Sequence, residues 1–200
     1  NPAVARFARR TFLRCRRCGL LYQVAFGLRP PSYGPAYFFE EYRRQYGRTY
    51  LEDFEPIRQA GLGRLRILRR LLPPRSGEEG FPSAPRLLDI GCAYGPFLQA
   101  CREQGLEAEG CDLSQEAARY VCEELGIPCR AADFEQDSPG FGPDGSYQAV
   151  SLWYVLEHFR EPGRVLERAA GLLRPGGVLA LATPNGAGIS GRRDREAFLR

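Results

Sequence analysis

From residue 86 onward, short apolar runs alternate with longer amphipathic segments. Short apolar runs bounded by turn residues predict buried strands, and apolar positions three or four apart predict helices. The expected strands are 86–90, 107–111, 127–131, 147–152 and 177–182, and the expected helices between them are 96–104, 115–125 and 162–173. This alternation predicts an α/β fold with a doubly wound, mostly parallel sheet. In such a sheet the ligand crevice lies at the carboxyl ends of the strands, where the strand order reverses.

The chain before residue 86 follows other patterns and is expected to form three further parts. Residues 1–35 form an N-terminal segment that is rich in Arg, then in Gly and Pro, and that carries Cys15 and Cys18. Residues 36–72 show aromatic and aliphatic residues at helical spacing, which predicts two helices. Residues 73–85 combine Pro, Gly and Ser without apolar periodicity and are expected to be a linker. The main α/β domain is then expected to span 86–200.

Composition changes this picture little. With 44% hydrophobic and 26% charged residues, the chain has the make-up of a globular domain, and no apolar run is long enough to cross a bilayer. The 7 cysteines are odd in number and several lie in apolar stretches, so we expect them to be reduced and the protein to be cytoplasmic. No secretory signal is visible, and a start at Asn1 without any Met leads us to expect trimmed ends.

The stretch RLLDIGCAYGPFL, residues 86–98, reads as a buried strand, a glycine turn and the start of a helix. Gly91 and Gly95 supply the turn and allow a ligand to approach the backbone at a helix N-terminus. A dinucleotide fingerprint would need small residues at 91, 93 and 96, but position 96 is Pro. Proline suits the first turn of a helix and disfavours close approach of a pyrophosphate.

Acidic residues end three successive expected strands. Asp89 would repel a pyrophosphate but would favour a ligand that carries an ammonium and a sulfonium group. Asp112 follows about twenty positions later, the separation at which an acid meets ribose hydroxyls. Asp133 could accept from an adenine amino group while Phe134 covers the ring. These features favour a cationic nucleoside, although acids at strand ends also serve as helix caps.

The runs LLDIGCAYG, GCDLS, AADF, SYQAVSLWYVLEHFREP and LLRPGGVLALATPN, within residues 86–185, resemble the class I S-adenosylmethionine-dependent methyltransferases. The resemblance implies a Rossmann-like fold, S-adenosyl-L-methionine as cofactor, and transfer of a methyl group to an O, N or C atom of a small molecule. It also implies two more strands after residue 185, so an exposed sheet edge is expected. The residues implied to contact the cofactor are Asp89, Gly91, Cys92, Ala93, Gly95, Asp112, Leu113, Asp133 and Phe134.

Methyl transfer is an in-line displacement that depends on positioning and on exclusion of water. A hydroxyl acceptor must also lose its proton, and His158 is the only histidine in the chain. His158 is therefore the candidate general base, with local packing in the LEH turn as the alternative. Glu157 is a weaker candidate. Trp153 either lines the cofactor pocket or only packs against the adjoining helix.

The segments RCRRCGLLYQ and PAYFFEEYRRQYGRTY are similar to a methyltransferase subgroup with a cysteine-bearing, zinc-ribbon-like N-terminal segment. In that subgroup a second cysteine pair completes a zinc site and the aromatic segment folds over the active site. Cys15 and Cys18 form the only CxxC of this chain, whereas structural zinc takes four ligands. We therefore expect no complete metal site within this sequence.

Two other functions are open to the same residues. A nicotinamide-dependent oxidoreductase would use the same type of sheet, but Pro96 and Asp89 disfavour it. A non-enzymatic RNA-binding module would use the arginines of the N-terminal segment, which we expect instead to form a solvated surface. Nucleic acid and membrane are thus not expected as partners.

Overall fold

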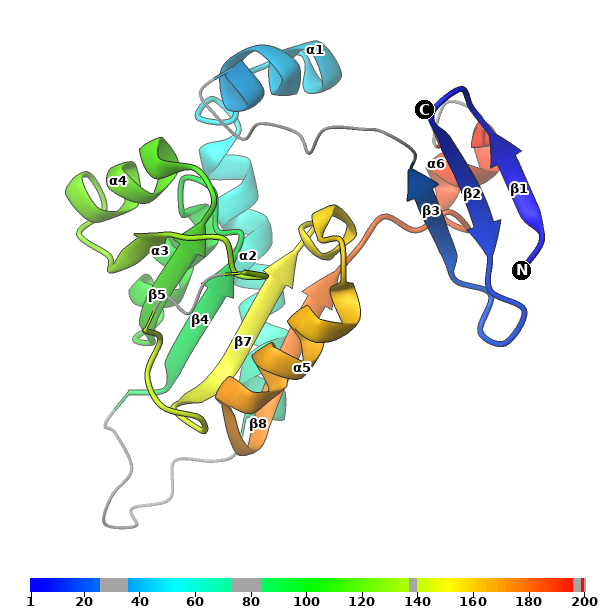
Figure 1. Ribbon diagram of the computed structural model, residues 1–200. Helices are drawn as coiled ribbons and strands as arrows, with labels where there is room; N and C mark the ends of the chain where they lie inside the picture. The colour runs from blue at the N-terminus through cyan, green and yellow to red at the C-terminus, as the bar shows by residue number, and fades with distance from the viewer. Residues whose placement is uncertain (26–35, 73–83, 137–139, 196–198, 200) are drawn as a thin grey trace. The chain divides into compact units, whose positions relative to one another are not determined.

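The computed structural model describes residues 1–25, 36–72, 84–136, 140–195 and 199 (Figure 1). The chain divides into two compact units, one of Asn1–Ser32 with Pro184–Arg200 and the other of Tyr33–Thr183. The unit that contains the large sheet therefore ends at Thr183. The helix α6 (Ile189–Arg193) belongs to the same unit as the N-terminal segment. This division differs from the expected 86–200 domain. Most of the expected linker, 73–83, lies outside the described residues.

The larger unit contains a 5-stranded sheet in the order β6-β5-β4-β7-β8, and every pair in it is parallel. The strand order reverses between β4 and β7, so the crevice lies at the carboxyl ends of these two strands. The predicted doubly wound α/β fold is confirmed, with all its expected strands. Their bounds are β4 (Arg86–Ile90), β5 (Glu107–Asp112), β6 (Cys129–Ala131), β7 (Tyr147–Trp153) and β8 (Leu173–Ala182).

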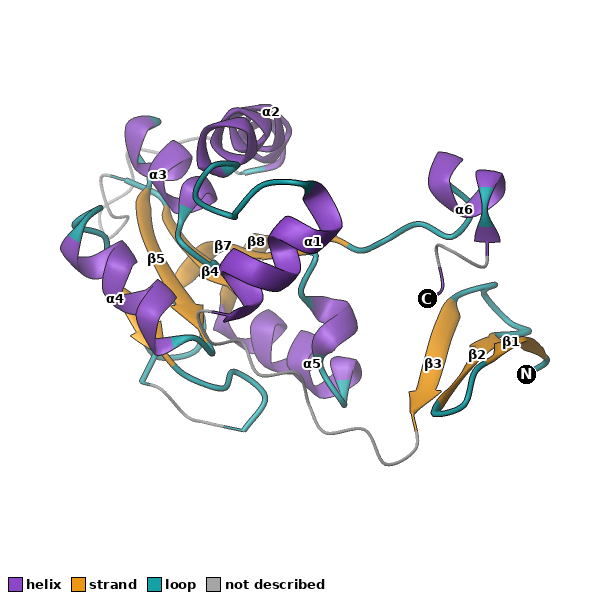
Figure 2. Cartoon of the chain, turned by 90° about the horizontal axis from the view of Figure 1, so that it is seen from above, coloured by secondary structure: helices purple, strands orange, loops and turns teal. Residues whose placement is uncertain are grey.

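Helices cover both faces of this sheet. Figure 2 shows α2 and α3 on one face and α5 on the other. Side chains alternate along β4, so Leu87 joins the core under α2 and α3 while Leu88 joins the core under α5. The predicted connecting helices are confirmed, and the Ser114 hydroxyl caps α4 by accepting from the Ala117 N–H at 3.2 Å. The bounds are α2 (Phe54–Leu71), α3 (Pro96–Glu103), α4 (Gln115–Glu123) and α5 (Pro162–Leu172).

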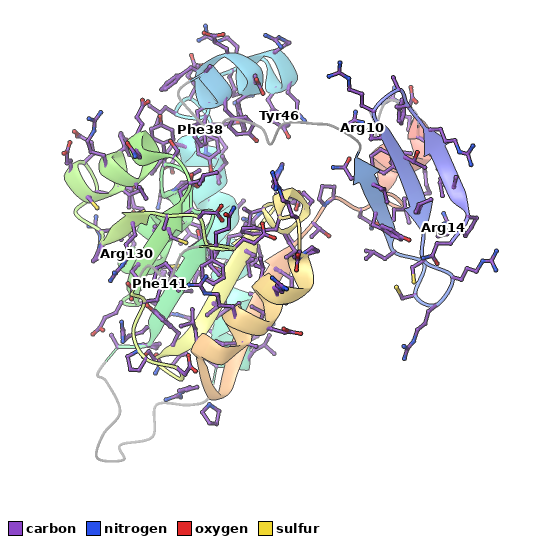
Figure 3. The ribbon with its side chains drawn as sticks, viewed as in Figure 1. Arg10, Arg14, Phe38, Tyr46, Arg130 and Phe141 are labelled. Atoms are coloured by element: carbon purple, nitrogen blue, oxygen red, sulfur yellow. The ribbon has the colours of Figure 1, made fainter. Side chains whose placement is uncertain are left out.

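The connection from β6 to β7 contains no helix among its described residues, and side chains cover that part of the sheet instead. Arg130 lies over the Phe141 ring at 5.5 Å (Figure 3). The Glu109 carboxylate accepts from the Tyr147 hydroxyl at 2.6 Å and from Arg86 Nη2 at 2.9 Å. Charged side chains and aromatic rings are thus joined by hydrogen bonds and a cation–π contact on these strands.

An aromatic cluster covers the carboxyl ends of the strands. The helical segments η1 (Tyr37–Glu41) and α1 (Tyr42–Tyr46) run beyond the arrowheads of β4 and β7 (Figures 1 and 2). Phe38 is only 3% exposed, and its ring centroid lies 5.1 Å from that of Tyr94 in the glycine turn. We call the group formed by Phe38, Tyr50, Tyr94 and Tyr120 the aromatic cap. It joins the helices expected at 36–72 to the turn.

The smaller unit holds a 3-stranded antiparallel sheet in the order β1-β2-β3, formed by β1 (Ala3–Arg6), β2 (Arg10–Arg14) and β3 (Leu21–Ala25). Cys15 and Cys18 lie in the turn between β2 and β3, where the Gly19 N–H donates to the Cys15 carbonyl at 2.9 Å. Arg10 and Arg14 extend from β2 (Figure 3). Among all described residues, no helix combines the length and apolar character needed to cross a bilayer.

Replacing Phe38 tests whether the aromatic cap is part of the folded core. We expect Phe38→Ala to lower the free energy of unfolding by about 3 kcal/mol, because it removes a buried ring and leaves a cavity against Tyr94. Chemical denaturation measures this loss. Ile67→Ala is the matched control, since Ile67 on α2 is 63% exposed and should change stability by less than about 0.5 kcal/mol. If both substitutions changed the free energy of unfolding equally, the aromatic cap would not be part of the folded core.

Candidate active site

Two buried carboxylates stand on neighbouring parallel strands at the crevice. Asp89 of β4 is 2% exposed and Asp112 at the end of β5 is 8% exposed. The Ser151 hydroxyl, on the β7 residue in register with Asp89, donates to Asp89 Oδ1 at 2.6 Å. Burial raises the pKa of Asp89 to about 7; the hydrogen bond from Ser151 and the charge of Arg64 oppose this rise. Ionised Asp89 is therefore a site that favours a positive ligand.

Asp112 holds the glycine turn in place. Its Oδ2 accepts from the Ala93 N–H at 2.8 Å, and its Oδ1 accepts from the Ser114 N–H at 2.9 Å. Burial raises the pKa of Asp112, and these backbone hydrogen bonds counteract part of the rise. Each carboxylate oxygen has a second lone pair. Asp112 can therefore bind ligand hydroxyls without releasing the turn.

The turn itself needs left-handed backbone at three places. Gly91, Ala93 and Gly95 have φ of 71°, 48° and 78°. A side chain at 91 would overlap Val155, and a Cβ at 95 would lie 2.8 Å from Val121 Cγ2, so both glycines are required for space as well as for φ. Ala93 carries a Cβ in this conformation, at a cost of about 1 kcal/mol. Cys92 in the same turn is buried, whereas Leu113 beside Asp112 is 51% exposed.

Asp133 and Phe134 lie shortly after β6 and differ in their surroundings. Asp133 Oδ1 accepts from the Glu135 N–H at 2.9 Å in a local turn. Phe134 is 2% exposed, and the Arg168 guanidinium lies 4.8 Å from its ring centroid. The ring packs into the core beneath α5, and the expected contact with adenine stays a prediction.

Trp153 and Arg64 form a second polar element of the crevice. The Arg64 guanidinium of α2 lies 4.5 Å from the Trp153 ring centroid, and its charge lowers the pKa of Asp89 against the effect of burial. Among the described residues, Trp153 Nε1 is buried without a hydrogen-bond partner. An unpaired buried donor beside a cation suits a ligand carboxylate. Trp153 also packs edge-on against Phe97 of α3, while its contact with a cofactor stays a prediction.

His158 and Glu157 lie in the short helix η2 (Leu156–His158), which follows β7 at the mouth of the crevice. Partial burial lowers the pKa of His158 and raises the pKa of Glu157. The charge of Glu157 also contributes to raised pKa values of Tyr37 and Tyr46 from the segment above the crevice. Neutral imidazole at pH 7 can accept a proton from an acceptor bound here.

Two of these residues, Ser151 and Arg64, were not singled out from the sequence. Ser151 is, with Gln148, one of two polar residues in a mainly apolar strand, and its register with Asp89 is not visible in the sequence. Arg64 lies in a helix that carries several other arginines. The sequence does indicate which way Arg64 faces. It comes three residues after the buried Gly61 and next to the buried Leu65, on the stripe of α2 that faces α3 and the sheet.

No three His, Cys, Asp or Glu side chains come together as a possible metal site within the part of the chain that the structure describes. Cys15 and Cys18 lie in one turn, and hydrogen bonds from the backbone of Cys18 and Arg17 lower the pKa of Cys15. These two thiols remain half of a structural zinc site by ligand number.

The strand order and the acid-bearing turn define a Rossmann-like methyltransferase fold, and comparisons with known proteins agree. A family model described as a methyltransferase domain matches residues 51–199. The ubiquinone biosynthesis O-methyltransferase of Caulobacter vibrioides is 33% identical over 142 residues, which cover 66% of this chain and 55% of that protein. The enzyme of the same name from Aeromonas salmonicida is 27% identical over 136 residues, which cover 66% of this chain and 54% of that protein.

Solved structures show the same fold. A SAM dependent methyltransferase from Archaeoglobus fulgidus aligns with a TM-score of 0.57 at 19% identity, over 78% of this chain and 62% of that one. A SAM-dependent methyltransferase from Thermotoga maritima is described as a possible histamine N-methyltransferase. It aligns with a TM-score of 0.55 at 20% identity and covers 80% of this chain and 67% of that one. The chain belongs to the methyltransferase-domain family, which confirms the resemblance drawn from its motifs. It spans about half the length of the curated relatives it matches.

Stability against pH tests the burial of Asp89. Its pKa is raised from 3.8 to about 7 in the folded protein, so between these values the folded state binds more protons than the unfolded state. The free energy of unfolding therefore falls as pH rises through this window and levels off above it. We expect Asp89→Asn to stabilise the ligand-free protein by about 2 kcal/mol at pH 8 and to give no such gain at pH 4.

Denaturant unfolding at several pH values measures this difference. The matched control is Asp144→Asn, because Asp144 is exposed and its replacement should leave the pH profile unchanged. A stability difference for Asp89→Asn that stays constant from pH 4 to pH 8 would show that its carboxyl is not held in the buried state described above.

Proposed function

We propose that this chain binds S-adenosyl-L-methionine and transfers its methyl group to a hydroxyl oxygen of a small molecule. The observation that carries the proposal is the buried Asp89 carboxylate. Within the described residues, Ser151 donates to it and no cation forms a salt bridge with it. A buried acid without a paired cation is costly unless a positive ligand compensates it. Its place beside the glycine turn supports a ligand with an ammonium and a sulfonium group.

The residues of the crevice fit each part of this cofactor. Asp89 suits the ammonium group of the methionine part, and Arg64 with Trp153 Nε1 suits its carboxylate. Asp112 suits the ribose hydroxyls, and Asp133 suits the adenine amino group. The Ala93 side chain makes the pocket beside the turn narrower than glycine would. The Ala93 N–H is held by its hydrogen bond to Asp112. When bound, the cofactor supplies a methyl group on a positively charged sulfur.

Oxygen is proposed as the accepting atom for two reasons. Two relatives from Caulobacter are named as O-methyltransferases, and the crevice mouth carries one histidine whose pKa is lowered by burial. A neutral His158 can take the proton of a hydroxyl as the oxygen attacks. The phenol rings of Tyr37 and Tyr46, whose raised pKa values include a contribution from the charge of Glu157, support a planar, aromatic acceptor.

The protein's part in the reaction is positioning and exclusion of water. The aromatic cap lies over the turn: the Tyr50 ring centroid is 6.0 Å from that of Tyr94, and burial raises the pKa of Tyr50 well above its ordinary value. A cover of this kind removes water from the site where acceptor oxygen, methyl carbon and sulfur must align.

Calorimetric titration with S-adenosylhomocysteine tests the cofactor assignment without the need for an acceptor. We expect the wild-type chain to bind this probe and Asp112→Asn to weaken the binding by more than about tenfold, because a carboxylate that accepts from ribose hydroxyls is lost. We also expect the affinity to rise about tenfold from pH 6 to pH 8, as Asp89 ionises to meet the ammonium group.

Two control titrations make this result specific. Exposed Asp144→Asn should bind like the wild type, and NAD⁺ should show no binding under the same conditions. Binding of NAD⁺ in preference to S-adenosylhomocysteine would instead support the oxidoreductase alternative. RNA retention that depends on salt, with no affinity for S-adenosylhomocysteine, would support the RNA-binding alternative.

His158→Gln tests the proposed general base. With labelled S-adenosyl-L-methionine and catechol as a hydroxyaryl probe, we expect kcat to fall by about a hundredfold or more, because proton removal by a positioned base contributes at least that much. Affinity for S-adenosylhomocysteine should stay within about twofold. The acidic limb of the wild-type kcat profile, set by a His158 pKa below its ordinary value, should disappear in the variant. An unchanged kcat would exclude the base role.

A further inference from the structure

Two cysteine sulfurs meet beside the glycine turn. Cys92 Sγ lies 3.5 Å from Cys129 Sγ. Cys92 is the second residue of the turn and is 3% exposed, whereas Cys129 is the first residue of β6 and is half-buried. The two residues belong to elements that are separated by β5 in the sheet. Two side chains can come this close across β5 only where β5 leaves space between them.

Gly110 provides that space. It is the residue of β5 that pairs in register with Cys129. A Cβ at position 110 would lie 2.7 Å from Cys92 Sγ, so any side chain there would occupy the space through which the two thiols approach each other. The glycine thus opens a passage above β5 in which one thiol from the turn and one thiol from β6 face each other.

We propose that Cys92 and Cys129 form an oxidation site that a hydroperoxide converts to a disulfide. Attack of the Cys129 sulfur on the peroxide cleaves the O–O bond, which gives a sulfenic acid on Cys129 and releases an alcohol, or water from hydrogen peroxide. The Cys92 sulfur then forms the S–S bond, and its proton leaves with the sulfenic oxygen as water. Two thiols lose two electrons in total, and the peroxide gains them.

The order of these steps follows from access and protonation. The hydrogen bond to Cys129 and then burial raise the pKa of Cys92 well above its ordinary value, so Cys92 stays a thiol. Peroxide reacts with thiolate rather than with thiol, and reaches the half-buried Cys129 more readily than the buried Cys92. Cys92 is therefore the resolving residue. Bond formation requires the sulfurs to approach from 3.5 Å to about 2.05 Å.

This approach disturbs the turn. The N–H groups of Gly91 and Cys92 both donate to the Cys111 carbonyl, at 2.8 and 3.1 Å, and the next N–H, that of Ala93, donates to Asp112. Movement of Cys92 toward β6 strains these bonds and shifts the Ala93 N–H away from the carboxylate. Oxidation should then weaken cofactor binding, a consequence that rests on the function proposed above.

The test starts from a Cys15→Ser, Cys18→Ser background, because those two thiols share one turn and would form a second disulfide. After treatment with hydrogen peroxide and alkylation of free thiols, peptide mapping should find the peptides of Cys92 and Cys129 linked, with a mass loss of about 2 Da. Affinity for S-adenosylhomocysteine should fall by more than about tenfold and return on reduction with dithiothreitol.

Single replacements distinguish this site from general oxidation. Cys129→Ser should bind S-adenosylhomocysteine like the reduced parent and should lose the response to peroxide, and Cys129→Ala should behave in the same way. Cys122→Ser is the matched control, since Cys122 is exposed and its thiol donates to the Cys129 carbonyl at 3.3 Å; this variant should keep the response.

Two results would overturn the proposal. Cys92 and Cys129 recovered as alkylated thiols after peroxide treatment would remove the oxidation site, and a complete 92–129 link with unchanged affinity would remove its effect on binding. Failure of the reduced parent to bind S-adenosylhomocysteine would instead count against the proposed function. Peptide mapping still reports on the disulfide in that case, so the two failures are separate.

Discussion

The hydrogen bond from the Ala93 N–H to the Asp112 carboxylate is the contact on which the site depends. It fixes a strained turn to the end of β5 and at the same time sets the acid to which we assign the ribose hydroxyls in the proposed function. The cost appears in the raised pKa of Asp112, because the carboxylate is buried before any ligand arrives. The site is therefore organised ahead of binding, and the fold pays in stability for that organisation.

The strain of the crevice is concentrated in two residues that are not glycine. Ala93 and Tyr154 have φ of 48° and 56°, on opposite sides of the point where the strand order reverses. Asp112 compensates the first, and the Tyr154 N–H donates to the Ala182 carbonyl of β8 at 2.8 Å. Hydrogen bonds to neighbouring strands thus hold both residues in place. They keep the backbone at the crevice in a left-handed conformation that an isolated chain would rarely adopt.

The sequence was sufficient for those features that depend on local pattern. Apolar runs and glycines predicted the strands, the turn and the acids at strand ends, because each is written in consecutive residues. Register was not predictable in the same way. Ser151 facing Asp89, Cys129 facing Cys92, and Arg64 over Trp153 all bring together residues far apart in the chain. The packing of the Phe134 ring into the core, next to the turn at Asp133, was likewise not predictable from local pattern.

The aromatic cap links the stability of the chain to access to its site. Phe38 packs on Tyr94, a residue of the turn, so the segment that covers the crevice is held by the same residues that shape it. Opening the crevice would therefore expose buried rings, whereas a ligand beneath the cap would add contacts to both turn and cover. Binding and closure are then coupled through one cluster, which explains why aromatic residues at helical spacing serve here as core and as cover at once.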